Sequence, residues 1–227
     1  TLPAVGDEDN SLKAIQKIGS LSFFENSIIK KIHLPDLMAL KTWNSKTNTL
    51  VYNNNIFNSN SGTWIIDKAK SKQKPSAQKS FRAFTERHLH LDVDNKSGFV
   101  TLSIKHQSPY IAKEWAELVV NEVNSFYRQK DKVGSEKAVK YLNQQMSMTK
   151  LSEIKLVLAE LLQEETKKLA LIEANEYYVF DYIDPPAVME KKSEPKRALI
   201  CIMGALLGGI LSILLVLIRH YAFTKKT

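Results

Sequence analysis

The chain has 227 residues, of which 44% are hydrophobic and 25% charged, and a formal net charge of +8. This length allows one domain with a sizeable core. Five Lys and Arg residues flank an apolar segment near the C-terminus, and without them 27 basic residues balance 24 acidic ones. This balance argues against a nucleic-acid-binding domain, whose Lys and Arg gather on the folded part.

The single cysteine, Cys201, excludes an internal disulfide. Because the chain begins with Thr1, we expect its natural N-terminus, which could include a first membrane segment, to lie upstream.

The first part of the chain carries helix and turn signals. A helix is predicted over residues 10–18, because Asn10 or Ser11 can cap it and Gly19 follows it. A second helix is predicted to begin at Ser20 or Ser22, to carry several Phe and Ile residues, and to end at Pro35. Residues 52–62 are rich in Asn and Ser and predict a surface loop.

The next segment predicts a connection, a helix and a hairpin. Lys-rich residues 67–74 are typical of an exposed connection, and Pro75-Ser76 predicts the start of a helix through about Glu86. Residues 89–93 and 99–104 alternate apolar and polar side chains around a turn. They therefore predict a β-hairpin.

The acidic turn of this hairpin does not satisfy the pattern of a calcium-binding loop. Asp92 and Asp94 stand two residues apart, as such a loop requires. However, the fifth, sixth and twelfth positions hold Lys96, Ser97 and Ser103, where the motif needs oxygen ligands, a glycine and a glutamate. We expect no metal site here.

Two long helices are predicted next. Ser108-Pro109 can cap and open a helix over residues 109–148, and a return helix is predicted over about 152–175. The apolar residues recur every three to four positions, so the two stripes can face each other. The stripes consist of Ile111, Trp115, Leu118, Val119, Phe126, Val133, Leu142 and Met146 on the first helix, and Leu151, Ile154, Leu158, Leu161, Leu169 and Ile172 on the second.

Residues 177–183 are aromatic and β-branched, which predicts a strand that pairs with the earlier hairpin. The predicted fold class is α+β, with a small α/β base near the membrane and a long projecting helical hairpin, all within one domain of residues 1–184. A plain helical bundle without a projection is the alternative.

A proline-rich connector is predicted over residues 185–197. Its prolines fix φ and lack amide donors, so the segment should be extended and stiff. The prolines are Pro185, Pro186 and Pro195, and the basic residues near the membrane are Lys191, Lys192, Lys196, Arg197 and, beyond the apolar segment, Arg219. Because both flanks are basic, charge does not settle the orientation.

The apolar segment over residues 198–218 predicts one transmembrane helix, followed by a tail, 219–227, which is cytoplasmic if the domain before the helix is periplasmic. Its 21 residues rise about 32 Å as a helix, which matches a hydrocarbon core of about 30 Å. Small residues recur along the segment, a pattern that allows two membrane helices to pack closely. These residues are Gly204, Gly208, Gly209 and Ser212.

The chain resembles the Wzz-type chain length determinants, or polysaccharide co-polymerases, of Gram-negative bacteria. The residues that carry the resemblance are Ile183-Asp184-Pro185-Pro186, the run from Glu190 to Ile200, the glycines from Gly204 to Gly209 and the short basic tail. Residues 37–44, 98–104 and 108–109 are also similar to that family. The family's N-terminal membrane helix and the first part of its periplasmic domain are not present in this chain.

The resemblance implies a periplasmic domain held at the inner membrane, several copies of which form a ring or bell. Such an assembly influences how many repeat units a polymerase adds to a lipid-linked polysaccharide, typically O-antigen. The implied partners are further copies of the chain in a homo-oligomer, the polymerase and the lipid bilayer, and the growing glycan is a further candidate. A related branch carries a cytoplasmic tyrosine kinase, but the tail here has no GxxxxGK[ST] phosphate-binding loop.

The sequence shows no motif for catalysis, so we expect a protein that is not an enzyme and binds no cofactor or metal. His88 and His90 would share one strand face, but two ligands are too few for a closed zinc site. No GxSxG or HExxH motif is present. The competing interpretation is a tail-anchored helical tether without a role in polysaccharide assembly. It is disfavoured because the helical stripe stops near Ala174, well before the membrane segment.

Overall fold

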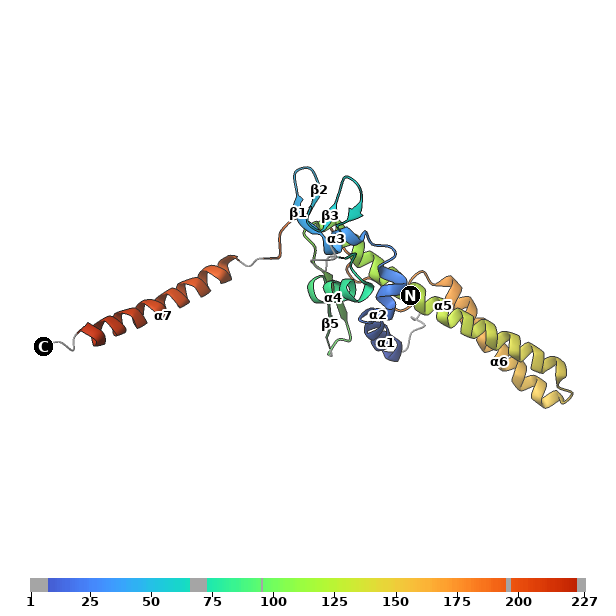
Figure 1. Ribbon diagram of the computed structural model, residues 1–227. Coiled ribbons are helices and arrows are strands. Elements are labelled where there is room, and N and C mark those ends of the chain that lie inside the picture. The colour runs from blue at the N-terminus through green and yellow to red at the C-terminus, as the bar shows by residue number, and fades with distance from the viewer. Residues whose placement is uncertain (1–7, 66–72, 95, 195–196, 224–227) are drawn as a thin grey trace. The chain divides into compact units, whose positions relative to one another are not determined.

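The computed structural model describes residues 8–65, 73–94, 96–194 and 197–223 (Figure 1). The chain forms two units, Thr1–Val188 and Met189–Thr227. The predicted connection at 67–74 lies mostly outside the described residues, as do Pro195, Lys196 and the end of the tail.

Three short helical elements open the first unit: α1 (Glu8–Ile18), α2 (Leu21–Phe23) and the π-helical turn η1 (Phe24–Ile28). The hydroxyl of Ser20 caps α2 by accepting the amide hydrogen of Phe23 at 3.3 Å. The predicted end at Pro35 was wrong, because this helical segment ends at Ile28. Pro35 instead lies in the first turn of a new helix, α3 (Leu34–Met38), where its missing amide hydrogen costs nothing.

The strands form three separate two-stranded antiparallel sheets. Their bounds are β1 (Leu40–Asn44), β2 (Thr49–Tyr52), β3 (Phe57–Asn58), β4 (Thr63–Trp64), β5 (Leu89–Val93) and β6 (Val100–Ile104). The turn between β1 and β2 contains Asn48 at a φ of 49°, a conformation that asparagine tolerates better than most residues. The predicted loop over 52–62 was only partly right, because β3 lies within it and pairs with β4.

The helix and hairpin predicted between residues 75 and 104 are confirmed. The helix α4 (Ala77–Arg87) begins after Ser76, whose hydroxyl accepts the amide hydrogen of Lys79 at 3.2 Å. Strands β5 and β6 then pair in register, with Leu91 opposite Leu102.

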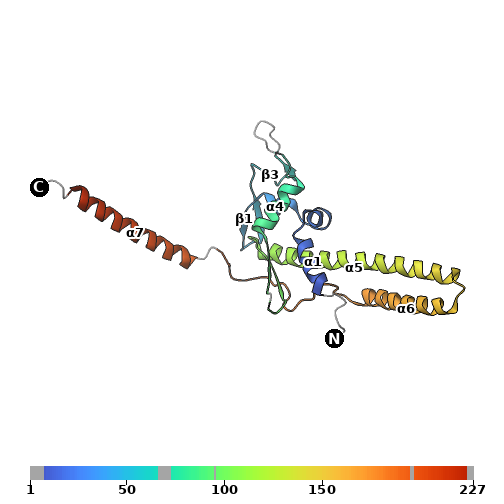
Figure 2. The ribbon, with the colours of Figure 1, turned by 90° about the horizontal axis from the view of Figure 1, so that it is seen from below.

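The two long helices are also confirmed, as α5 (Pro109–Met148) and α6 (Ser152–Ala174). They run antiparallel and side by side, as Figures 1 and 2 show. The structure therefore overturns the alternative of a plain helical bundle. We call residues 137–165 the outer hairpin, and we call α1 to α4, the three sheets and the first half of α5 the base.

The predicted apolar stripes meet only in part. Ile172 is fully buried, and Leu142 is nearly so. In contrast, Leu151, Ile154 and Leu161 are 64%, 46% and 44% exposed. These three side chains therefore stay largely exposed, because at the outer hairpin each helix has only the other one to pack against.

The core lies in the base, where aromatic residues from several elements meet. Phe24 packs against Phe84 with ring centroids 5.3 Å apart, and Phe84 packs against Trp115 at 5.8 Å. Each fully buried large apolar side chain contributes about 1.5–3 kcal/mol. The buried core comprises Ala14, Ile18, Phe23, Phe24, Ile28, Ile32, Leu37, Ala83, Phe84, Trp115, Val119, Val123, Tyr127, Ile172 and Tyr178.

The predicted strand over residues 177–183 was wrong, because this segment is irregular, with bends, and pairs with no strand of the described part of the chain. Its backbone bonds to the side chain of Asn124 on α5. The Asn124 Oδ1 accepts the amide hydrogens of Val179 and Phe180 at 2.8 and 2.9 Å, and its Nδ2 donates to the Phe180 carbonyl at 2.8 Å. One buried amide thus satisfies the groups that a neighbouring strand would otherwise bond.

The second unit contains one helix, α7 (Arg197–Phe223). Residues 200–220 of this helix are long and apolar enough to cross a membrane. The predicted helix over 198–218 is confirmed as a helix.

Candidate functional site

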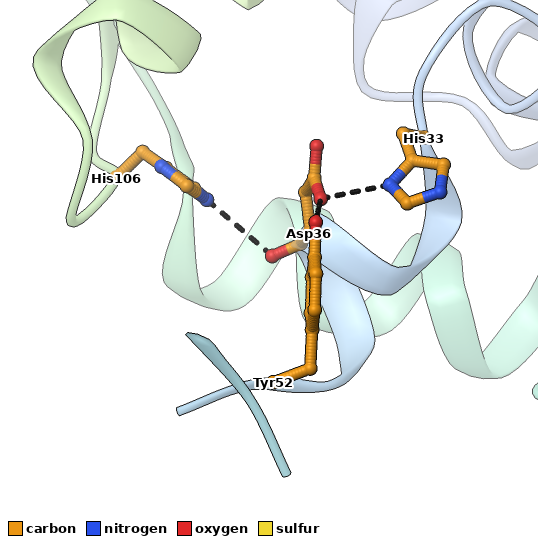
Figure 3. A network of polar contacts seen from close by, with 4 residues as sticks. All are labelled: His33, Asp36, Tyr52 and His106. Atoms are coloured by element: carbon orange, nitrogen blue, oxygen red, sulfur yellow. Dashed lines mark hydrogen bonds and ion pairs between the residues drawn. The ribbon is translucent and has the colours of Figure 1, made fainter. Parts of the chain in front are cut away.

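A network of polar contacts centred on Asp36 joins three segments of the base (Figure 3). The Tyr52 hydroxyl, from β2, donates to Asp36 Oδ1 at 2.6 Å, and His33 Nδ1 lies 2.9 Å from the same oxygen. His106 Nε2, from the segment before α5, donates to the Asp36 carbonyl at 3.3 Å. Burial, together with the hydrogen bond to Asp36, raises the pKa of Tyr52 well above its usual value, so its hydroxyl keeps its proton.

His106 also connects this network to the start of α5. Its Nδ1 accepts the amide hydrogen of Ser108 at 3.1 Å, and Ser108 is the residue that precedes α5. A ring that accepts at Nδ1 and donates at Nε2 is a neutral imidazole. The neutral form of His106 therefore matches the hydrogen bonds around it.

His88 and His106 pack against each other and against Trp115. Their ring centroids are 5.7 Å apart, and they lie 5.4 Å and 5.0 Å from the Trp115 ring. His88 Nδ1 donates to the carbonyl of Lys105 at 2.6 Å. Burial lowers the pKa of both histidines, and the nearby positive charge of Arg87 lowers that of His88 further. Both rings are therefore neutral at pH 7.

The sequence predicted that His88 and His90 would share one face of a strand, but the structure pairs His88 with His106 instead. His88 precedes β5 and is packed into the base, whereas His90 is exposed on the strand. Among the residues that the structure describes, no group of three or more His, Cys, Asp or Glu side chains could hold a metal ion. The network is suited to holding α3, β2 and the start of α5 in register.

A second set of contacts holds the chain that leads out of α6 against α5. Besides Asn124, Arg128 donates to the carbonyls of Asn175 and Glu176. The Tyr178 hydroxyl donates to Asp131 Oδ2 at 2.7 Å, and Tyr178 is buried. The last residues before the connector are thus fixed to the base through side chains of α5.

The connector residues predicted from the sequence follow directly. Pro185 is exposed and Pro186 half-buried in an irregular stretch without helix or strand. Lys191 and Lys192 are exposed, Arg197 begins α7, and Pro195 and Lys196 lie outside the described residues.

The small residues predicted for helix packing lie along α7. A Cβ atom at Gly204, Gly208 or Gly209 would meet no atom within 4 Å, so these positions leave an open surface on the helix. The Ser212 hydroxyl donates to the Gly209 carbonyl at 2.8 Å, and Arg219 is exposed near the other end of the helix.

Exposed apolar residues gather on the outer hairpin. Each is at least 44% exposed. They are Tyr141, Met148, Leu151, Ile154, Leu156, Val157 and Leu161. Exposed apolar side chains gathered in one region are typical of a protein contact surface.

Sequence reasoning missed Asp36, Asn124 and Arg128. Asn124 had a detectable signal, because it stands between Val120, Val123 and Tyr127 on the buried face of a helix, where an amide needs a partner. Arg128 had none, since its partners Asn175 and Glu176 lie far away in sequence. Asp36 has one near partner, His33, but its bonds to Tyr52 and His106 form only on folding.

Comparison with known families gives one match. Residues 141–221 match the model described as "G-rich domain on putative tyrosine kinase", the GNVR domain. The match runs from the end of α5 through α6 and the connector into α7, a little over a third of the chain. No curated protein matches the chain.

GNVR domains are found in membrane-associated polysaccharide co-polymerases and Wzc-type proteins. The match therefore supports a relationship to the polysaccharide co-polymerases in the broad sense, with a role in polysaccharide export or chain-length control.

Proposed function

We propose that this protein is a non-catalytic scaffold of the bacterial inner membrane that controls the chain length of a lipid-linked surface polysaccharide of the O-antigen type. Its main domain lies in the periplasm, and it acts by forming a homo-oligomer that contacts the polymerase. The observation that carries the proposal is the match of residues 141–221 to the GNVR domain, because it covers α6, the connector and α7 together.

The outer hairpin supports assembly through its exposed apolar residues. Ile154, Val157 and Leu161 follow one another at spacings of three and four on α6, so they form a stripe on one side of the helix. Burying such a stripe between copies stabilises an oligomer by about 25 cal/mol per Å² of apolar surface, less the cost of association.

The structure between α6 and α7 favours this proposal over a tail-anchored tether. A tether that zippers towards the membrane needs a helix that continues into the lipid. Residues 175–194 contain no helix, and Asn124 and Arg128 bond this segment to the base instead.

The test is a pair of substitutions, Val157→Asp and Leu161→Asp, in the full-length protein. We expect smaller assemblies in light scattering of the detergent-extracted protein and a changed polysaccharide ladder on gels from cells. Gln163→Asp, an exposed polar position on the same helix, is the matched control and should leave both unchanged. An unchanged ladder after deletion of the whole gene would contradict the proposed function.

The membrane helix offers an independent test of assembly. Gly204→Leu with Gly208→Leu removes the close approach that small residues allow, so we expect weaker helix packing and smaller oligomers. Leu206→Ile with Leu215→Ile keeps side-chain volume on the same helix and serves as the control. Oligomers of unchanged size would exclude this helix face from the assembly.

A further inference from the structure

A groove of about 690 Å³ lies where α5 faces η1. Ser27 contributes from η1, and the α5 residues that line it recur every three to four positions from Glu122 to Lys137. This is a different side of α5 from the one that carries Arg128, Asp131 and the contacts to the end of α6. Its volume falls in the range of about 300–1,000 Å³ that is typical of ligand sites, but the groove is open to solvent and therefore suits an extended ligand better than an enclosed one.

The charge of the groove is positive. The carboxylate of Glu122 pairs with Lys31 and is therefore neutralised. Lys130 and Lys137 have no carboxylate within ion-pair distance among the described residues, and no acidic residue stands three or four positions from either. The groove thus presents two ammonium groups that can bind an anion, although that of Lys130 also lies over the Tyr127 ring, 5.4 Å from its centroid.

The other lining groups suit a sugar better than a protein segment. Ser27, Ser125 and Gln129 make no side-chain hydrogen bond within the described part of the chain, so they can bond hydroxyl groups. Val133 and the part of Phe126 that the Lys17 ammonium does not cover supply apolar surface for the C–H groups of a sugar ring. A second copy of the chain would need a broader apolar surface, which lies instead on the outer hairpin.

Gly134 keeps the groove open. It stands between the two lysines in the interior of a long helix, where glycine costs about 1 kcal/mol relative to alanine. A Cβ atom there would meet no atom within 4 Å, so packing within the chain does not require glycine. The missing side chain leaves space that an occupant of the groove can use.

We propose that this groove binds a short stretch of anionic saccharide, whose sugar units carry carboxylate or phosphate groups. Lys130 and Lys137 would bind the anionic groups, and Ser27, Ser125 and Gln129 the hydroxyls. This inference rests on the proposed function and adds to it a direct contact with the glycan and its chemical class.

The test is a binding titration of the full chain in lipid nanodiscs. The probes are a short oligogalacturonate and a neutral glucan of equal length, measured by calorimetry. We expect the oligogalacturonate to bind and the neutral glucan to bind at least tenfold more weakly, a difference of about 1.4 kcal/mol. Lys130→Gln with Lys137→Gln should weaken oligogalacturonate binding about tenfold, whereas Lys167→Gln with Lys168→Gln, exposed on α6, should leave it unchanged.

A second variant pair tests the groove without changing its charge. Gly134→Leu should fill the space and weaken binding, while the chain stays folded because the new side chain enters open space. Gly134→Ala is the matched control and should retain most of the binding. Circular dichroism confirms that both variants are folded.

Three results would overturn the inference. The first two are equal binding of both probes and no binding of the oligogalacturonate. The third is a set of groove variants that change oligomer size and leave saccharide binding intact, because the groove would then be a contact between subunits. None of these results would affect the proposed function, provided that deletion of the gene changes the polysaccharide ladder. If deletion leaves the ladder unchanged, the proposed function fails whatever the groove binds.

Discussion

The base and the outer hairpin are built from the same kinds of residue but use them differently. In the base, Phe23, Phe24, Trp115 and Val119 are buried almost completely in a core to which several elements contribute. In the outer hairpin, Leu151, Leu156 and Val157 are more than half exposed, although they are equally apolar. The base therefore buries its own hydrophobic surface, whereas the outer hairpin leaves apolar surface exposed. If this exposed surface serves assembly, as proposed above, substitutions in the two regions should affect stability and assembly separately.

The largest effect is expected from removing the central aromatic residue of the base. Trp115→Ala should lower the free energy of unfolding by about 3–5 kcal/mol, because Trp115 is 2% exposed and contacts Phe84, His88 and His106. Urea unfolding followed by circular dichroism measures it. Leu161→Ala on the outer hairpin should change the same quantity by less than about 0.5 kcal/mol in the dissociated protein. Equal losses at the two positions would contradict the difference between the regions.

A smaller effect is expected where the base holds the segment that leads to the connector. Asn124→Ala leaves the backbone groups of Val179 and Phe180 without their partner, which should cost about 1–3 kcal/mol. Hydrogen exchange at the Val179 and Phe180 amides should become faster. Asn143→Ala, which loses only a bond to Val139 within its own helix, should leave this exchange unchanged. Unchanged exchange in Asn124→Ala would mean that other contacts hold the segment.

Local signals and periodicity predicted most of the fold. The bounds of the helix at 109–148 were correct because Ser108-Pro109 opens it and no proline interrupts it, and the hairpin at 89–104 followed from its alternation. The strand at 177–183 was wrong because the amide of Asn124, more than fifty positions away, replaces a strand as partner. The Asp36 network could not be foreseen either, since Asp36 and His106 meet only through folding.

The histidine pair makes the base, and not the outer hairpin, sensitive to acid. Because burial lowers the pKa of His88 and His106 below the ordinary value of about 6.5, the unfolded chain binds more protons than the folded one. Their contribution to stability is therefore fully present above that value and is lost as the pH falls below it.

Unfolding measured from pH 7.5 to pH 5.5 tests this dependence. We expect the free energy of unfolding to fall with pH in the parent protein and to fall less in His88→Gln. His90→Gln, exposed on β5, is the control and should behave as the parent. A parent protein whose stability rises as the pH falls would contradict the assignment of neutral rings.

The smallest effect is expected at the boundary between the two regions. Gly134→Ala should raise the free energy of unfolding by about 0.5–1 kcal/mol, since alanine favours the helix and its Cβ meets no neighbour. Thermal unfolding measures the change, and Ser125→Ala, on the same helix face, is the control with little expected gain. The base determines global unfolding. A gain in the free energy of unfolding from Gly134→Ala would therefore show that α5 around Gly134 unfolds together with the base. No gain would mean that the outer hairpin frays first and that its stability comes from the assembly.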